Sequence, residues 1–274
     1  MPVSGGTHDR AAESGRRGAL TAGITRTPDP TSGPDGRLVR WGRPAAVLVL
    51  GGAVLWGTLS IIGQIITHTS LGSAVVRGDT RVSRWFFAGR TPQFDRLTHY
   101  GTMLSDTLTA IIVTVVVVTV LFVLRRRWEA ATVLVAILGE LFVFVLVTAT
   151  VQRARPPVPH LDPAPPTSSF PSGHTAAAVA LYVGFAVLLL RSAVRRALAV
   201  PLAVLFCLVP FVVGISRLYR GMHYPSDVVF GALGGGCWLL LTLYVLGGPP
   251  SRALRAASSR RSAAHEDTTP ARTP

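Results

Sequence analysis

The sequence predicts an all-α, polytopic membrane protein with six transmembrane helices in one bundle. Apolar residues make up 49% of the 274 residues and charged residues only 15%, whereas a soluble domain carries about 25% charged residues. Six apolar runs cover most of the chain, at 44–66, 102–124, 130–151, 174–190, 197–215 and 228–246. Each run is close to the ~20 residues that a helix needs to cross ~30 Å of hydrocarbon.

The two ends of the chain differ from this pattern. Residues 1–43 and 249–274 are rich in small and polar residues and arginine, with too little apolar content to form a core. We expect both segments to be disordered cytoplasmic tails, and residues 44–248 to form the membrane domain. The first apolar run is long enough to span a bilayer, so we interpret it as a membrane anchor and not as a cleaved signal peptide.

The net charge of +14 reflects 27 basic residues, all arginine. They cluster between the apolar runs and in the tails, which argues against nucleic acid as a partner and for membrane topology. Clusters at 37–43, 125–127, 191–196 and 252–261 would share one side of the membrane, and the positive-inside rule makes that side cytoplasmic.

The segment 67–101 also contains arginines, although this topology places it outside. Its arginines stand on both sides of Trp85, Phe86 and Phe87, a mixture typical of an amphipathic helix on the lipid headgroups. A solvated loop is the alternative.

Four polar motifs fall at the outward ends of the predicted helices. They are Arg153-Ala154-Arg155-Pro156 after the third run, Ser172-Gly173-His174 before the fourth, Ser216-Arg217 after the fifth, and His223 with Asp227 before the sixth. Because these motifs meet at the same membrane face, we predict a single active site at the outward face of the bundle.

The residue types in these motifs suit a phosphate group. Arg155 and Arg217 offer planar guanidinium forks for phosphate oxygens. Ser172 is placed as a helix N-cap, and the backbone N–H groups of Gly173 and His174 add donors at a helix start. If residues 223–227 are helical, His223 and Asp227 share a face, and a carboxylate bonded to one ring nitrogen leaves the other free to attack. From the residues alone, His174 and His223 divide the acid and nucleophile roles, and the spacing to Asp227 favours His223 as the nucleophile.

The chain resembles the type 2 phosphatidic acid phosphatase family of integral membrane lipid phosphatases over about residues 44–248. The family's Pro-Ser-Gly-His motif stands complete from Pro171 to His174. Its third motif is complete as Ser216, Arg217, His223 and Asp227. Its first motif is partial, with Arg155 and Pro156 in place but Thr148 where the family has Lys.

The resemblance implies roles for these residues. His223 would be the nucleophile that forms a phosphohistidine, Asp227 its orienting partner and His174 the general acid. The substrate would be a lipid phosphate or a polyprenyl pyrophosphate in the bilayer, bound by Arg155, Arg217, Ser172, Gly173 and Arg153. We expect no metal and no cofactor, because arginines meet the phosphate charge. The expected location is a bacterial plasma membrane with the site on the outer side, and the oligomeric state stays open.

The departure at Thr148 leads to a specific hypothesis about Arg153. Pro156 biases Arg155 out of the α region, and in an extended chain Arg153 and Arg155 point to the same side. Arg153 would then take over part of the missing Lys role. Alternatively, Arg153 only reaches the headgroups.

Residues with polar side chains inside the apolar runs need their own interpretation. Glu140 lies fifteen residues before Arg155, about 22 Å along a helix, which is too far to contact the phosphate. We expect an interhelical hydrogen bond there in preference to a substrate role. Cys207 and Cys237 are interpreted as small buried residues.

Two other functions remain open. In a lipid phosphotransferase, an alcohol in place of water would take the phosphoryl group from His223. A transporter or lipid-binding protein would use the arginines to hold anionic headgroups, but it would not need His223 and Asp227 at this spacing.

Overall fold

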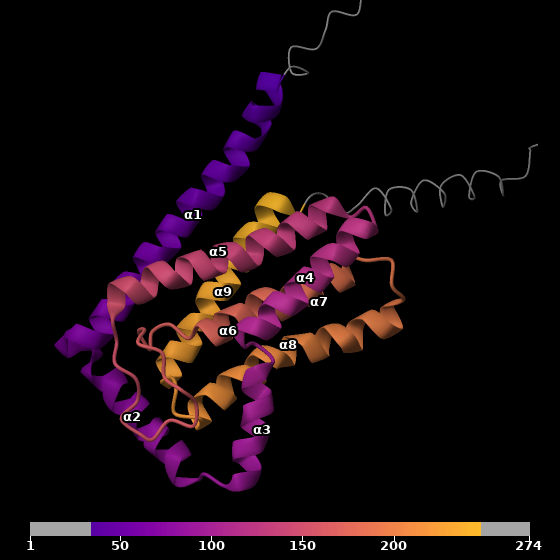
Figure 1. The fold of residues 1–274 in the computed structure, drawn as a ribbon. Helices are drawn as coiled ribbons and strands as arrows, with labels where there is room; N and C mark the ends of the chain where they lie inside the picture. Colours follow the sequence, from indigo (N-terminus) through magenta and orange to yellow (C-terminus); the bar gives the residue numbers. More distant parts are fainter. Residues whose placement is uncertain (1–33, 248–274) are drawn as a thin grey trace, which may run out of the picture. The chain divides into compact units, whose positions relative to one another are not determined.

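Figure 1 shows the helices of a computed structural model, which describes residues 34–247. The chain divides into two units, residues 1–43 and 44–274, and all contacts below lie within the second. The helices are α1 (Pro34–His68), α2 (Ser73–Ala88), α3 (Pro92–Met103), α4 (Thr107–Val123), α5 (Arg127–Val151), α6 (Gly173–Ala178), α7 (Gly184–Leu190), α8 (Arg196–Tyr219) and α9 (Pro225–Leu246). A π-helical turn, Val179–Val183, joins α6 to α7. The predicted tails lie outside the described residues, except that 34–43 form the first turns of α1.

Among the described residues, five helical segments are long and apolar enough to cross a membrane: Gly42–His68, Arg127–Val151, Gly173–Leu190, Arg196–Tyr219 and Pro225–Leu246. A sixth span exists if α3 and α4 count as one, since they meet at an angle of 42° across a short break. The predicted helical membrane fold is therefore confirmed, with five spans or up to six. The predicted second run at 102–124 is α4 preceded by this bend, because α3 ends at Met103 and a new helix starts at Thr107.

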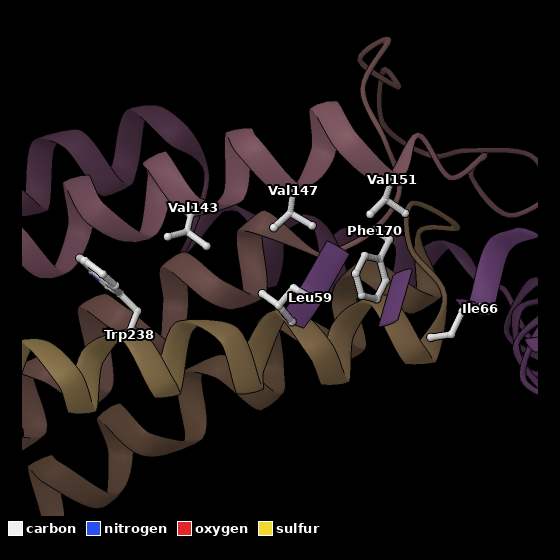
Figure 2. Close-up of a cluster of buried hydrophobic side chains, with 7 residues drawn as sticks. All are labelled: Leu59, Ile66, Val143, Val147, Val151, Phe170 and Trp238. Atoms are coloured by element: carbon white, nitrogen blue, oxygen red, sulfur yellow. The ribbon is translucent and has the colours of Figure 1, made fainter. Parts of the chain in front are cut away.

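Helices α1, α5 and α9 pack against one another through an apolar cluster (Figure 2). Its buried members are Leu59, Ile66, Val143, Val147, Val151, Phe170 and Trp238. The indole N–H of Trp238 donates to the carbonyl oxygen of Val135 at 3.1 Å, so the polar atom of this buried ring is satisfied. Phe170 belongs to the loop before α6, and its place in the cluster therefore fixes that loop at the end of α5.

Helices α6 and α9 approach each other closely through glycines. A Cβ atom at Gly231 would lie 2.5 Å from the carbonyl oxygen of Ser172, and one at Gly235 would lie 2.5 Å from that of Ala176. Small residues four apart allow membrane helices to bring their backbones together. This contact places the start of α6 against the start of α9, where the predicted site residues lie.

The segment 67–101 is largely helical and is not the solvated loop of the alternative prediction. It forms α2 and α3, and α2 buries Asp79 and Ser83 while Trp85 stays 69% exposed. The Tyr219 hydroxyl accepts from the Thr91 N–H at 2.8 Å, which fastens the start of α3 to the end of α8. The location of α2 on the headgroups stays a prediction.

Two of the expectations for the apolar runs are wrong. Within residues 34–247 the Glu140 carboxyl makes no hydrogen bond, although the residue is only 6% exposed. Cys207 and Cys237 are free and exposed on the protein surface, because each lies on a helix face that the bundle does not cover.

Candidate active site

The loop between α5 and α6, residues 152–172, carries much of the site. Helix α5 ends where Gln152 adopts a left-handed conformation (φ 52°, ψ 41°), and Pro156 keeps Arg155 out of the helical region. The loop is closed on itself, because the Ser169 N–H donates to the carbonyl oxygen of Arg153 at 2.8 Å and the Arg153 N–H donates to Ser168 Oγ at 3.0 Å. It therefore presents Arg155 and the later residues at fixed positions.

Ser172 is the N-cap of α6, as predicted. Its hydroxyl accepts from the Thr175 N–H at 3.4 Å and lies 3.0 Å from the Thr175 hydroxyl. The Ser172 N–H donates to the carbonyl oxygen of Asp227 at 2.9 Å, so the starts of α6 and α9 are joined directly. The predicted contacts of Ser172 and Gly173 with phosphate stay predictions.

His223 lies in the turn between α8 and α9 and is buried. The turn is possible because Gly221 adopts a positive φ of 74°, which favours glycine. His223 Nδ1 lies 2.7 Å from the carbonyl oxygen of Ser169. A carbonyl oxygen only accepts, so Nδ1 carries the proton and Nε2 carries the lone pair.

The charge state of His223 agrees with this tautomer. Burial lowers the pKa of His223 below its usual value of 6.5, and the charge of Arg217 acts in the same direction. Asp227 acts in the opposite direction without reversing the shift. The imidazole is therefore neutral near pH 7, which is the state a nucleophile needs.

The arrangement of Asp227 differs from the predicted one. Its Oδ2 lies 3.8 Å from His223 Nδ1, too long for a hydrogen bond. The reason is that α9 begins at Pro225, so His223 precedes the helix and does not share a helical face with Asp227. Asp227 instead accepts from the Tyr224 N–H at 2.8 Å and from Ser169 Oγ at 2.5 Å. It thus holds His223 through Ser169, whose carbonyl oxygen accepts the hydrogen bond from the Nδ1–H of the imidazole.

The charges of two arginines act on His223, and each arginine has a buried donor without an acceptor among residues 34–247. Arg217 donates through Nη1 to Thr102 at 2.8 Å and Asp162 at 3.0 Å, while its Nε–H has no partner. Arg155 donates through Nη1 to the Met222 carbonyl oxygen at 2.8 Å, and its Nε–H is likewise unpaired. Burial lowers the pKa of Arg155, partly offset by Asp227, but a guanidinium stays charged.

Asp162, in the loop before α6, fixes Arg217 in place. Its carboxylate accepts from Arg220 at 2.8 Å and 2.5 Å in a two-point contact, and from Arg217. Burial raises the pKa of Asp162, but Arg220 and Arg217 outweigh burial and hold the pKa below its usual range. Asp162 is therefore ionised and orients Arg217.

His174 lies in the first turn of α6. Its Nε2 is 3.9 Å from Asp106 Oδ1, and its carbonyl oxygen accepts from Ser105 Oγ at 2.7 Å. The charges of Arg217 and Arg155 both act on His174, and His223 is close enough to act on it as well. The structure therefore brings both predicted histidines and two of the predicted arginines together.

Arg153 is placed differently from the hypothesis that it replaces the missing lysine. It is 4% exposed, and its guanidinium donates to Asp227 Oδ1 at 2.5 Å, Asp79 Oδ2 at 2.7 Å and Ser226 Oγ at 2.7 Å. The two carboxylates hold its side chain in the protein interior, and its partners differ from those of Arg155. Thr148 supplies no charge, and its hydroxyl donates to the Val145 carbonyl oxygen at 2.9 Å.

Sequence reasoning missed Asp79, Asp162 and Ser169. Asp79 could have been singled out from the sequence, since it is the one acidic residue of α2 and lies between Arg77 and Arg81. Asp162 and Ser169 lie in an irregular loop, where spacing does not reveal contacts. Within residues 34–247, no three or more His, Cys, Asp or Glu residues form a group able to hold a metal ion.

The fold and the site define a polytopic helical membrane protein with a histidine and arginine centre suited to an oxyanion. Residues 128–248 match the sequence model of the PAP2 superfamily, the family that the motifs predicted.

Three known proteins are similar to parts of the chain. A lipid A 1-phosphatase from Rhizobium etli is 38% identical over 77 residues, which is 28% of this chain and 29% of that protein. The match thus spans under a third of the curated relative. The crystal structure of the first transmembrane PAP2 type phosphatidylglycerolphosphate phosphatase from Bacillus subtilis shares the fold, with a TM-score of 0.59 and 23% identity over 73% of this chain and 93% of that one. Aquifex aeolicus LpxE gives a TM-score of 0.49 and 24% identity over 61% of this chain and 94% of that one.

Proposed function

We propose that this protein is a membrane lipid phosphatase that hydrolyses a lipid phosphate or polyprenyl pyrophosphate through a phosphohistidine at Nε2 of His223. One observation carries the proposal. The hydrogen bond from Nδ1 to the Ser169 carbonyl leaves the Nε2 lone pair of a neutral imidazole free. The charges of Arg155 and Arg217 act on this imidazole, and each arginine has a buried Nε–H without a partner among residues 34–247. A dianionic phosphate supplies the acceptors that these donors need.

The residues account for both halves of the reaction. In the first half, the Nε2 lone pair of His223 forms a bond to phosphorus as the bond from phosphorus to the lipid oxygen breaks. His174 donates a proton to that oxygen, and Arg155 and Arg217 stabilise the charge on the phosphoryl oxygens. In the second half, water attacks phosphorus and gives a proton to His174, the bond to Nε2 breaks, and inorganic phosphate leaves.

The bundle indicates a lipid substrate. The site lies at the ends of spans that cross the bilayer, so a substrate with its tail in the membrane can present its headgroup there. Phosphatidic acid, lysophosphatidic acid and undecaprenyl pyrophosphate are candidates. The names of the relatives from Rhizobium etli and Bacillus subtilis are also those of enzymes acting on lipid phosphates.

We also propose that the site faces the outside of a bacterial plasma membrane. Helix α5 starts at Arg127 and ends at the site, α8 starts at Arg196 and ends at the site, and α7 ends at Leu190 beside Arg191. The arginine clusters thus lie at the helix ends remote from His223. The positive-inside rule assigns those ends to the cytoplasm.

The test is release of inorganic phosphate from a panel of lipid phosphates and pyrophosphates by the purified protein in detergent. At least one substrate should be hydrolysed, EDTA should not stop the reaction, and His223→Ala should abolish it. Glu140→Gln is the matched control, since it changes a buried carboxyl on α5 and should keep wild-type activity. Transfer to an added alcohol in place of water would identify a phosphotransferase. Headgroup binding without turnover of any substrate would favour the non-enzymatic alternative.

A further inference from the structure

Asp79 is a buried carboxylate on α2, outside the residues that match the superfamily. Its Oδ1 accepts from the Ser226 N–H at 3.1 Å, and its Oδ2 accepts from Ser226 Oγ at 2.5 Å. Ser226 belongs to the first turn of α9, whose backbone N–H groups have no partner within the helix. Asp79 therefore fixes the start of the helix that follows His223.

Arg153 links Asp79 to Asp227. Its Nη2 donates to Asp79 Oδ2 at 2.7 Å, and its Nη1 donates to Asp227 Oδ1 at 2.5 Å. The guanidinium carbon also lies 4.3 Å from the centre of the Tyr224 ring. Burial lowers the pKa of Arg153, but the two carboxylates outweigh burial and raise it. One guanidinium thus serves two buried carboxylates at once.

The connection continues from Asp227 to the imidazole. With Oδ1 held by Arg153, the carboxylate turns Oδ2 toward Ser169 Oγ and the Tyr224 N–H. Ser169 in turn presents its carbonyl oxygen to His223 Nδ1. Each residue of this series, from Asp79 through Arg153, Asp227 and Ser169 to His223, is hydrogen-bonded to the next.

We propose that Asp79 is a positioning residue for His223, acting through Arg153 and Asp227 to aim Nε2 at the phosphorus atom. The inference rests on the proposed phosphatase function. Asp79 makes no hydrogen bond or ion pair with His223, Arg155 or Arg217. Its removal therefore affects the reaction by misplacing the nucleophile and not by weakening phosphate binding.

An isosteric change isolates this role. In Asp79→Asn the side chain keeps its size but presents an NH₂ group to Arg153 or Ser226, both of which are donors. The Arg153 guanidinium loses one carboxylate and can swing toward the other. If Asp79 positions His223, this substitution should lower the rate of the step in which Nε2 attacks and leave the substrate affinity unchanged.

The experiment measures His223 phosphorylation in a single turnover by rapid quench, at several substrate concentrations. For Asp79→Asn we expect a rate constant about 10- to 100-fold below wild type, as for partners that orient an active-site imidazole. The substrate concentration for half-maximal rate should stay within about twofold of wild type, since the phosphate contacts remain. Rates are expressed per phosphorylatable site, so a loss of folded protein alone does not change them.

Glu140→Gln serves as the control for a buried carboxyl change and should match wild type. Ser226→Ala removes only the hydroxyl between Asp79 and Arg153, and it should show a smaller loss of the same kind even if Asp79→Asn fails to fold. Wild-type phosphorylation rates in Asp79→Asn or Ser226→Ala would overturn the positioning role while the phosphatase stands. Absence of phosphorylation in the wild type would overturn the proposed function itself.

Discussion

The hydrogen bond between His223 Nδ1 and the Ser169 carbonyl oxygen determines what the imidazole can do. A carboxylate at Nδ1 could share or take its proton, whereas a backbone carbonyl leaves the proton on Nδ1. Asp227 acts one residue further away, through the Ser169 hydroxyl at 2.5 Å. The tautomer is therefore set by the backbone of the loop before α6, and the carboxylate keeps that loop in place.

The lowered pKa of His223 predicts how the reaction depends on pH. Activity requires the neutral imidazole, so it is lost as pH falls through the pKa of the folded protein. Because burial places that pKa below 6.5, the acidic limb of kcat/KM should lie below pH 6.5, where a solvated histidine would already be protonated. The profile is measured with a substrate whose own ionisation has been titrated. An acidic limb above pH 6.5, after correction for the substrate, would contradict the prediction.

The contacts of Arg153 predict the effect of Arg153→Ala, both alone and combined with Thr148→Lys. Arg153→Ala leaves the buried carboxylates of Asp79 and Asp227 without their cation, which should cost about 3–5 kcal/mol of stability, as for other broken buried ion pairs. A lysine in place of Thr148 cannot restore a pair with both carboxylates from α5. We expect Thr148→Lys to recover none of the activity lost in Arg153→Ala, as measured by kcat/KM and thermal unfolding. Recovery by the double variant would instead favour a shared cationic role at the phosphate.

At the scale of elements, the sequence predicted the spans well because composition alone identifies a helix in lipid. It could not show that α9 starts at Pro225, and the expected contact of Asp227 with His223 depended on that boundary. It also could not show that α2 turns its polar Asp79 and Ser83 inward, since that depends on which buried partners α2 meets. The motif residues Arg155, Arg217, His174 and His223 were found, while the loop contacts of Asp162 and Ser169 were not.

The close approach of α6 and α9 predicts a position-specific effect of adding one methyl group. A Cβ at Gly235 would lie 2.5 Å from the Ala176 carbonyl oxygen, whereas the nearest atom to a Cβ at Gly236 is Val179 Cγ1 at 4.0 Å. Gly235→Ala should therefore lower stability by about 1–3 kcal/mol, the usual cost of overpacking. Gly236→Ala should leave it close to wild type. Thermal unfolding in detergent compares the two, and equal unfolding temperatures would count against the packing described.

At the scale of the whole molecule, the arginine clusters at 125–127 and 191–196 lie at the ends of the spans opposite the site. This separation predicts that the end of α9, at Leu246, is cytoplasmic and that residues 152–172 are outside. A reporter that works only in the cytoplasm should be active when fused after Leu246. A single cysteine in place of Gln152, which is exposed, should react with a membrane-impermeant thiol reagent in intact cells. A cytoplasmic position for residue 152 would reverse the proposed orientation.

The covalent step on His223 is the centre of the account, and trapping it is the most direct test. The protein is mixed with a lipid phosphate carrying radiolabelled phosphorus, quenched in alkali during turnover, and digested to map the label. We predict acid-labile label on the peptide containing His223, lost on incubation with water and absent from His223→Ala, while Glu140→Gln is labelled as wild type. Turnover with no labelled intermediate, label on His174 in place of His223, or continued hydrolysis by His223→Ala would contradict the mechanism.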